Sequence, residues 1–447
     1  MLAHLAKVNV ALYLRDKRAR KLARRLHRDQ KAVRLRQRTQ QAFDAAFGAR
    51  SQIVDMMGAS ASGESIDHKV RVRFTLPSSF SMIDSPEFAI RALADFARAL
   101  RSARLGTVYI DFSKLSEYDL GANGLLDIIV DELTVEFRRK RRILRWKGNF
   151  PSNPAHARFV RSMGVIKRLK IVHEYPSSDD EERLAIFDKR CRHYIRVLRP
   201  QRIDEKSKVT ADFADHINRC LRTIDRQLLP ESRMRLCAYV GEILDNAEQH
   251  SGLLDWAIQG YLDTMVETPM CEVAIFNFGR TIAETFEGLP QESFARMQIQ
   301  KYIDLHSQRR FFSAGWRKED LYTLIALQGN VSSKNLKASD TRGNGTVDLI
   351  DFFQRVHSEC SGTSGPEARM VIVSGSTRVL FDGKYKMTPN QDGLRVIAFN
   401  ADNNLEERPD REYVRKLEGV SFPGTLIGLK FPLSTSRSTV EALGDST

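Results

Sequence analysis

The stretch GEILDNAEQHSG, residues 241–252, decides how the second half of this 447-residue chain is interpreted. Its apolar residues recur at helical spacing, so that Ile243 and Ala247 share one face of a helix. Glu242 and Asn246 lie one turn apart on the opposite face. An amide oxygen can join phosphate oxygens around Mg²⁺, and a carboxylate one turn away can accept a proton from an attacking hydroxyl or water. The stretch therefore predicts a helix that serves phosphate chemistry.

The pattern E-x-x-x-N-A-x-x-H resembles the N box of the GHKL ATPases, which include anti-sigma-factor kinases, histidine kinases, gyrase and Hsp90. It is more similar to the anti-sigma-factor kinase form, which has a histidine four residues after the asparagine, as His250 is here. Histidine kinases commonly have a basic residue where this chain has Gln249. The resemblance implies that Glu242 is the catalytic base, that Asn246 binds Mg²⁺ and nucleotide, and that His250 belongs to the nucleotide site.

A second landmark is NFGRTI, residues 277–282, which follows the strand-like run Cys271–Asn277. It resembles the family's adenine-binding turn, D-x-G-x-G-I, with Asn277 in place of the aspartate and Thr281 in place of the second glycine. The carbonyl of Asn277 can still accept a hydrogen bond from the adenine amine, although without the added strength of a charge. Gly279 allows the backbone to approach the base closely.

A third landmark is RGNGT, residues 342–346, followed by the apolar, helix-like run Val347–Phe353. It resembles the second glycine box of the family. Glycines that open a helix offer backbone N–H groups and the positive end of the helix dipole to phosphates. The nucleotide-binding residues predicted in this turn are Gly343, Asn344, Gly345 and Thr346.

Residues 283–341 stand where the family has its mobile ATP lid, and Lys334 in this segment can reach a terminal phosphate. Much of the segment nevertheless has helical periodicity. The run GTLIGL, residues 424–429, resembles the family's terminal G-T strand and adds Thr425 to the nucleotide site. The strands predicted near the end of the chain are Met370–Ser374, Thr377–Phe381, Leu394–Phe399 and Thr425–Phe431.

We therefore expect residues 184–433 to form a GHKL-type α/β sandwich, a mixed sheet with helices on one face, that takes ATP and Mg²⁺ as cofactors. Residues 176–183 read as a polar linker, and residues 434–447 as a tail. A histidine kinase is disfavoured, because neither His193 nor His216 stands in an acceptor-helix pattern.

Residues 66–175 alternate strand and helix patterns, which predicts parallel crossovers and an α/β layer domain. Two stretches, Tyr109–Ile129 and His156–Ile171, resemble a STAS domain, the fold of anti-sigma-factor antagonists. In that family a D-S-S-G-type turn places the phosphoacceptor serine at a helix N-terminus. Here Asp119 is followed by Leu-Gly-Ala at 120–122, so no acceptor hydroxyl occupies that place.

Residues 1–60 are predicted to form a basic amphipathic helical arm. Residues 1–40 hold thirteen Lys and Arg against two Asp, so +11 of the net charge of +14 falls there. A short heptad seam, which includes Leu5, Val8 and Leu12, is typical of a helix that pairs with another helix. The arm is expected to contact nucleic acid or an anionic membrane, or else to pack on a partner subunit or on its own body.

Three functions follow from these patterns. The first is an ATP-binding regulatory protein in which Mg-ATP switches contacts with the STAS-like domain or with a partner protein, with slow hydrolysis. The second is an anti-sigma-type serine/threonine kinase that acts on a STAS partner. The third is a degenerate scaffold or nucleic-acid-binding regulator. The five cysteines form no CxxC pair, and no apolar run approaches the ~20 residues of a membrane span, so we expect a cytoplasmic protein.

Overall fold

The computed structural model describes only certain ranges of the chain. These are residues 50–59, 61, 70–102, 104–165, 183–192, 205–250, 252–329, 345–360, 366–390 and 393–433. Residues 1–49 of the predicted arm, residues 166–175 of the predicted α/β layer domain, most of the predicted linker and the predicted tail lie outside the described residues. The one described helix of the arm is α2 (Gln52–Ala59). The chain is an α/β protein, as expected.

The first unit, residues 50–165, is built on a small parallel sheet in the order β1-β3-β5. Each strand is connected to the next through a helix, which gives the parallel crossovers that the sequence predicts. Its main elements are β1 (Arg71–Thr75), α3 (Pro86–Ala99), β3 (Thr107–Asp111), α4 (Leu120–Arg139), β5 (Arg145–Gly148) and α5 (Pro154–Ser162). Two short strands, β2 (Ser79–Phe80) and β4 (Glu117–Tyr118), pair beside them.

The second unit, residues 183–433, contains a seven-stranded sheet in the order β13-β10-β9-β14-β8-β7-β6. All neighbouring pairs of this sheet are antiparallel, so the prediction of a mixed sheet is wrong for the described strands. Hairpins connect β7 to β8 and β9 to β10, which requires no parallel crossover. The strands are β6 (Leu184–Cys191), β7 (Gly252–Asp263), β8 (Met270–Gly279), β9 (Arg369–Gly375), β10 (Thr377–Phe381), β13 (Val414–Lys416) and β14 (Phe422–Pro432).

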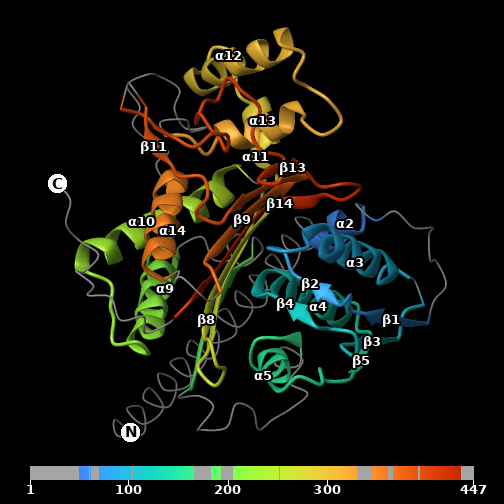
Figure 1. Ribbon diagram of the computed structural model, residues 1–447. Helices are drawn as coiled ribbons and strands as arrows, with labels where there is room; N and C mark the ends of the chain where they lie inside the picture. The colour runs from blue at the N-terminus through green and yellow to red at the C-terminus, as the bar shows by residue number, and fades with distance from the viewer. Residues whose placement is uncertain are drawn as a thin grey trace, which may run out of the picture.

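Three helices cover one face of the seven-stranded sheet: α9 (Glu205–Arg222), α10 (Pro230–His250) and α14 (Gly345–Cys360). Figure 1 shows them together on one side of the sheet, with α10 close to both neighbours. The predicted strand Leu394–Phe399 is shorter in the structure, where only β12 (Arg395–Val396) pairs with β11 (Thr388–Pro389).

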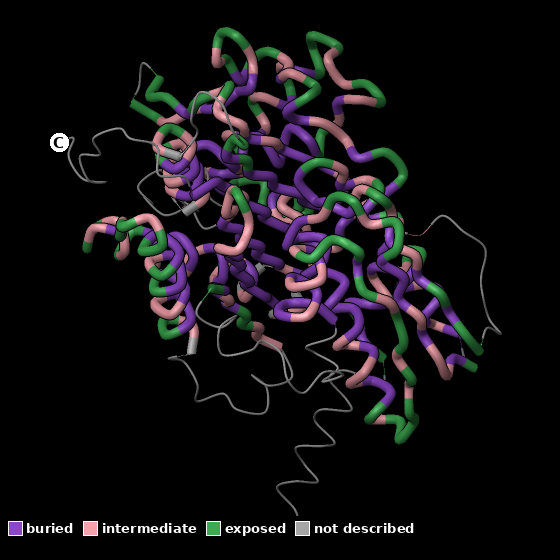
Figure 2. The backbone as a smooth tube through the Cα atoms, turned by 60° about the horizontal axis from the view of Figure 1, so that its bottom comes forward, coloured by how far each residue is buried: buried purple, intermediate pink, exposed green. Residues whose placement is uncertain are grey.

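The opposite face of the same sheet is covered by the first unit rather than by solvent. Helix α4 lies against β7, β8 and β14, and the sheet residues Phe276, Phe278 and Phe422 share one apolar core with α4 residues such as Leu125. The molecule is therefore layered as helices, large sheet, α4 with its neighbours, and small sheet (Figure 1). Figure 2 shows buried segments running through this interior, with exposed residues on the outer loops and helix ends.

The segment predicted as a mobile ATP lid begins with three packed helices, α11 (Ile282–Glu287), α12 (Phe294–Gln308) and α13 (Lys318–Ile325). Ile299, Ile303 and Trp316 are buried in the main core of the second unit. The described part of the predicted lid, residues 283–329, is therefore a set of packed helices, as its helical periodicity indicates, rather than a free loop, because apolar side chains hold it in place. Among the described helices, none is long and apolar enough to cross a membrane.

Candidate functional site

Helix α10 carries the two residues on which the sequence interpretation depends. Ile243, Leu244 and Ala247 are buried against the large sheet, as their spacing predicts. Glu242 and Asn246 lie on the other side of the helix and are partly exposed. The polar face of α10 is thus held at a fixed height above the sheet by the apolar face below it.

Asn277, near the end of β8, meets α10 between these two residues. Its Nδ2 donates to the backbone carbonyl of Ile243 at 3.3 Å. Its Oδ1 is buried and has no hydrogen-bond partner among the described residues, and the same holds for Oδ1 of Asn246. A buried acceptor left unpaired costs about 1–3 kcal/mol. Two such acceptors on adjoining elements indicate a place where a ligand supplies donors or a cation.

Polar side chains continue from Asn277 across the neighbouring strands. In the antiparallel register Asn277 pairs with Thr425 of β14, and Thr425 pairs with Ser374 of β9. Directly opposite residues share a face, so these three side chains form one row on the α10 side of the sheet. The hydroxyls of Thr425 and Ser374 lie 2.9 Å apart, and Ser374 Oγ accepts from the N–H of Ile282 at 2.8 Å. Ser374 was not predicted, although a lone serine in the apolar run MVIVSG was a visible signal.

Gly279, the glycine predicted to lie against the adenine base, has a backbone conformation that favours glycine. Gly279 has φ +122°, and Gly424, which pairs with the preceding residue Phe278, has φ +129°. A Cβ on Gly424 would lie 2.0 Å from the carbonyl oxygen of Asn277. Thr281, which stands in place of the family's second glycine, instead caps α11 and accepts from the N–H of Glu284. The turn therefore leads into α11, which begins at Ile282.

Helix α14 begins at Gly345, the second glycine of the predicted turn, and packs along α10. Thr346 lies in its first turn and is partly exposed. Burial raises the pKa of Asp348, with a further rise from the charge of Glu242, which places these two carboxyls near one another. Arg395 and Arg235 oppose that rise, so two cations lie at this end of the site. Sequence reasoning missed Asp348 and both arginines, because they become neighbours only through the packing of α14 on α10.

Some predicted residues lie outside the described part of the chain. Lys334, Gly343 and Asn344 are among them, and of His250 only the backbone at the end of α10 is described. The structure brings together Glu242, Asn246, Asn277, Gly279, Thr425 and the start of α14. Within the described residues no three His, Cys, Asp or Glu side chains are grouped for a metal. An Mg²⁺ held by one amide oxygen and phosphate oxygens would fit the Asn246 acceptor.

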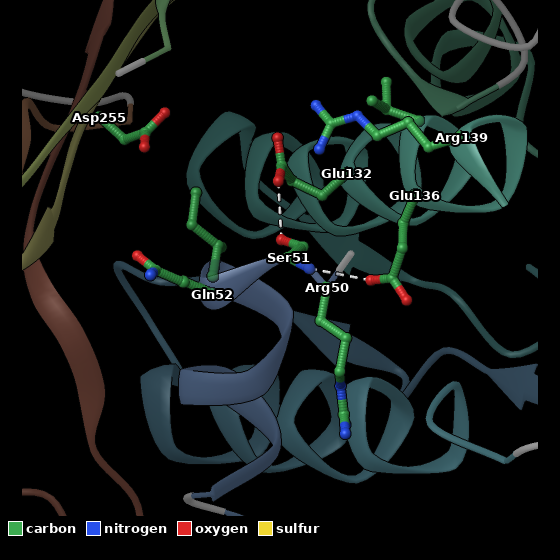
Figure 3. Close-up of a pocket in the computed structure, with 9 residues that line it drawn as sticks. Arg50, Ser51, Gln52, Glu132, Glu136, Arg139 and Asp255 are labelled. Atoms are coloured by element: carbon green, nitrogen blue, oxygen red, sulfur yellow. Dashed lines mark hydrogen bonds between the residues drawn. The ribbon is translucent and has the colours of Figure 1, made fainter. Parts of the chain in front are cut away.

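A separate pocket lies between α2, α4 and β7 (Figure 3), on the face of the large sheet opposite to α10. Its glutamate side chains already accept hydrogen bonds from other residues of the protein. Glu132 accepts from the hydroxyl of Ser51 at 2.7 Å, and Glu136 accepts from the N–H of Ser51 at 2.9 Å. Arg101 also donates to Glu136 at 2.6 Å. These contacts fix the start of α2, and we assign no ligand to this pocket.

Comparison with protein-family models, with curated proteins and with solved structures gave no match for this chain.

Proposed function

We propose that this chain is an ATP-binding regulatory protein of the GHKL type, in which Mg-ATP binding changes the contacts of the first unit. The observation that carries the proposal is the pair of buried, unpartnered amide oxygens on Asn246 and Asn277. They lie on the helix and the strand where the family's Mg²⁺ and adenine ligands are expected. No other described pair of side chains combines this position with unmet acceptors.

Each residue of the site has a distinct task in the proposal. Nδ2 of Asn277 is held by the carbonyl of Ile243, which leaves Oδ1 to accept from the adenine amine. Thr425 borders the base, and the start of α14 provides N–H groups for phosphates. The Asn246 oxygen would hold Mg²⁺, which neutralises phosphate charge when bound. Glu242 would accept the proton of an attacking water, which gives slow hydrolysis.

The strands of the site also connect it to the first unit. On β8, Glu272 lies five residues from Asn277, and on β14, Lys430 lies five residues from Thr425, so each pair points to opposite faces of the sheet. Glu272 accepts from the N–H of Leu120, at the start of α4, at 2.7 Å. A shift of β8 and β14 on nucleotide binding therefore reaches α4 without any intermediate element.

The alternative of a serine/threonine kinase remains a proposal that rests on Glu242, and it requires a separate STAS protein as substrate. The turn after Asp119 in this chain has no hydroxyl, and it lies buried against the large sheet. Phosphate transfer from ATP to an added STAS protein, absent in a Glu242→Ala variant, would favour the kinase over the switch.

Calorimetric titration of ATP with Mg²⁺ into the full-length protein tests the proposal. The full chain is needed because a fragment over 184–433 would expose Phe276, Phe278 and the rest of the sheet face that α4 covers. We expect saturable binding that Asn246→Ala weakens and Gln308→Ala, an exposed change on α12, leaves unchanged. Wild-type protein that shows no heat of binding at millimolar ATP would rule the proposal out.

A further inference from the structure

The small sheet β1-β3-β5 is the outermost layer of the part of the chain that the structure describes, and described elements pack on only one of its faces. Val72, Phe74, Val108 and Ile110 point inward and belong to the core shared with α3 and α4. Residues alternate between faces along a strand, so the intervening residues lie on the outer face. Figure 1 shows the three strands on the far side of α4 from the large sheet.

The outer face carries cations in two rows that the strand register aligns. Arg71 pairs with Thr107, which pairs with Arg145 in the next strand. The second row consists of Arg73, Tyr109 and Lys147. All four cations are exposed, and Tyr109 is partly exposed between them. With strands ~4.8 Å apart, each row is roughly 10 Å long, and the two rows lie about 7 Å apart.

One acidic residue of the three strands lies on this face, and it is already neutralised. Asp111 is buried, and Nε of Arg73 donates to its carboxylate at 3.1 Å. That hydrogen bond holds the pKa of Asp111 well below its usual range. Arg71, Arg145 and Lys147 have no ion-pair partner among the described residues. Within the described ranges, the face therefore carries three positive charges that no ion pair compensates.

At the centre of the face a guanidinium lies over an aromatic ring. The guanidinium of Arg73 lies 5.0 Å from the centre of the Tyr109 ring, and its side chain is 66% exposed. Because Asp111 holds the guanidinium at its edge, the stack is oriented before any ligand arrives. Arginine planes and tyrosine rings are the surfaces on which unpaired bases stack.

We propose that this outer face binds single-stranded nucleic acid, with a base on the Arg73–Tyr109 stack and the neighbouring phosphates on Arg71, Arg145 and Lys147. A flat surface about two nucleotides wide suits a single strand, whose bases are open to stacking, and not a duplex, whose bases are enclosed. The basic arm over residues 1–40 is excluded as an occupant by its own charge of +11. An anionic membrane would attract the positive charges, but it offers no planar base that could stack on the oriented Arg73–Tyr109 pair.

Fluorescence anisotropy with labelled 12-nucleotide RNA and DNA strands tests the proposal on the full-length protein. The triple variant Arg71→Glu, Arg145→Glu, Lys147→Glu should bind at least about tenfold more weakly at ~100 mM salt. Its binding should also depend less steeply on salt, by about two units of slope. A matched triple, Lys208→Glu, Lys301→Glu, Lys318→Glu, changes the charge equally at exposed sites elsewhere and should differ from wild type by less than about threefold.

The role of the stack is tested separately from the charge. Tyr109→Leu should weaken binding about fivefold or more, whereas Tyr109→Phe, which retains the ring, should bind as wild type does. Circular dichroism and thermal unfolding of each variant show that the fold is retained. The proposal is overturned if wild type binds neither strand, if both triples lose equal affinity, or if Tyr109→Leu binds normally. If the triple variant of Arg71, Arg145 and Lys147 lost binding to phosphatidylserine vesicles but bound nucleic acid as wild type does, the face would be assigned to a membrane.

Discussion

Asn246 and Glu242 are neighbours on α10, yet they would act at different stages of a reaction. Asn246 would link the protein to the phosphates through Mg²⁺, so it contributes to binding. Glu242 would act on the proton of the nucleophile, so it contributes only after binding. Asn246→Ala should weaken ATP·Mg²⁺ binding, and Glu242→Ala should leave binding nearly intact while turnover falls by on the order of a hundredfold or more. Titration calorimetry and phosphate release measure the two effects, and equal loss of binding in both variants would contradict the assignment.

Asn277 gives a second prediction at the same scale. Asn277→Asp restores the family residue, so the hydrogen bond from the adenine amine becomes charge-assisted and ATP should bind about 1 kcal/mol more tightly. The carboxylate can no longer donate to the carbonyl of Ile243, which the amide does at 3.3 Å, so the nucleotide-free protein should melt at a lower temperature. Calorimetry and thermal unfolding check the two halves. A gain for GTP equal to that for ATP would show that position 277 does not contact the adenine amine.

At the scale of elements, the sequence predicts those helices and strands that a local hydrophobic pattern determines. The apolar face of α10, the strand before Asn277 and the alternation of strands and helices in the first unit were predicted from spacing alone. The start of α4 was not, because Gly121, Asn123 and Gly124 disfavour a helix on propensity. The strand pairing of the large sheet was also missed, since periodicity reports which face is buried and not which strand lies beside it.

Gly124 explains why α4 keeps a residue that weakens a helix. A Cβ at this position would lie 2.0 Å from Oε1 of Gln259 and 3.0 Å from Cζ of Phe276, so the helix can approach the sheet only without a side chain there. Gly124→Leu should separate the two layers and lower the free energy of unfolding by roughly 3 kcal/mol or more. Gly241→Ala on α10 is the control, because its Cβ would meet nothing closer than 3.8 Å.

The control should stabilise the protein by about 0.5–1 kcal/mol, the helix preference of alanine over glycine. Denaturant unfolding followed by circular dichroism measures both variants. If Gly124→Leu were as stable as wild type, α4 would not be docked as closely as its contacts with Gln259 and Phe276 require.

At the scale of the whole molecule, polar groups buried between the two units determine how firmly the units are joined. Asp119 caps α4 by accepting from the N–H of Ala122 at 2.8 Å, and Glu272 accepts from Leu120 at 2.7 Å. Burial raises the pKa of both carboxyls. Nζ of Lys430 lies 3.4 Å from Oε1 of Glu272, and the charge of Glu272 raises the pKa of Lys430. The single ammonium of Lys430 thus favours the ionised form of both buried carboxyls.

This arrangement gives stability a defined dependence on pH. A carboxyl whose folded-state pKa is raised stabilises the fold below its unfolded pKa, and that contribution is lost as pH rises through the folded value. In wild type the ammonium of Lys430 counters this loss, because it favours the ionised carboxyls. Lys430→Met removes that effect, so stability should fall steeply between about pH 5 and pH 8, and by roughly 3 kcal/mol or more at pH 8.

Thermal unfolding at pH 5, 6.5 and 8 measures how the stability of Lys430→Met depends on pH. Two further variants show which groups cause that dependence. Lys416→Met removes a cation from an exposed pair with Glu418 and should cost less than about 1 kcal/mol at every pH. Adding Glu272→Gln to Lys430→Met removes one buried carboxyl, while the amide oxygen can still accept from Leu120, so much of the loss at pH 8 should be recovered. If Lys430→Met lost as much stability at pH 5 as at pH 8, packing of the lysine stem rather than its charge would join the two units.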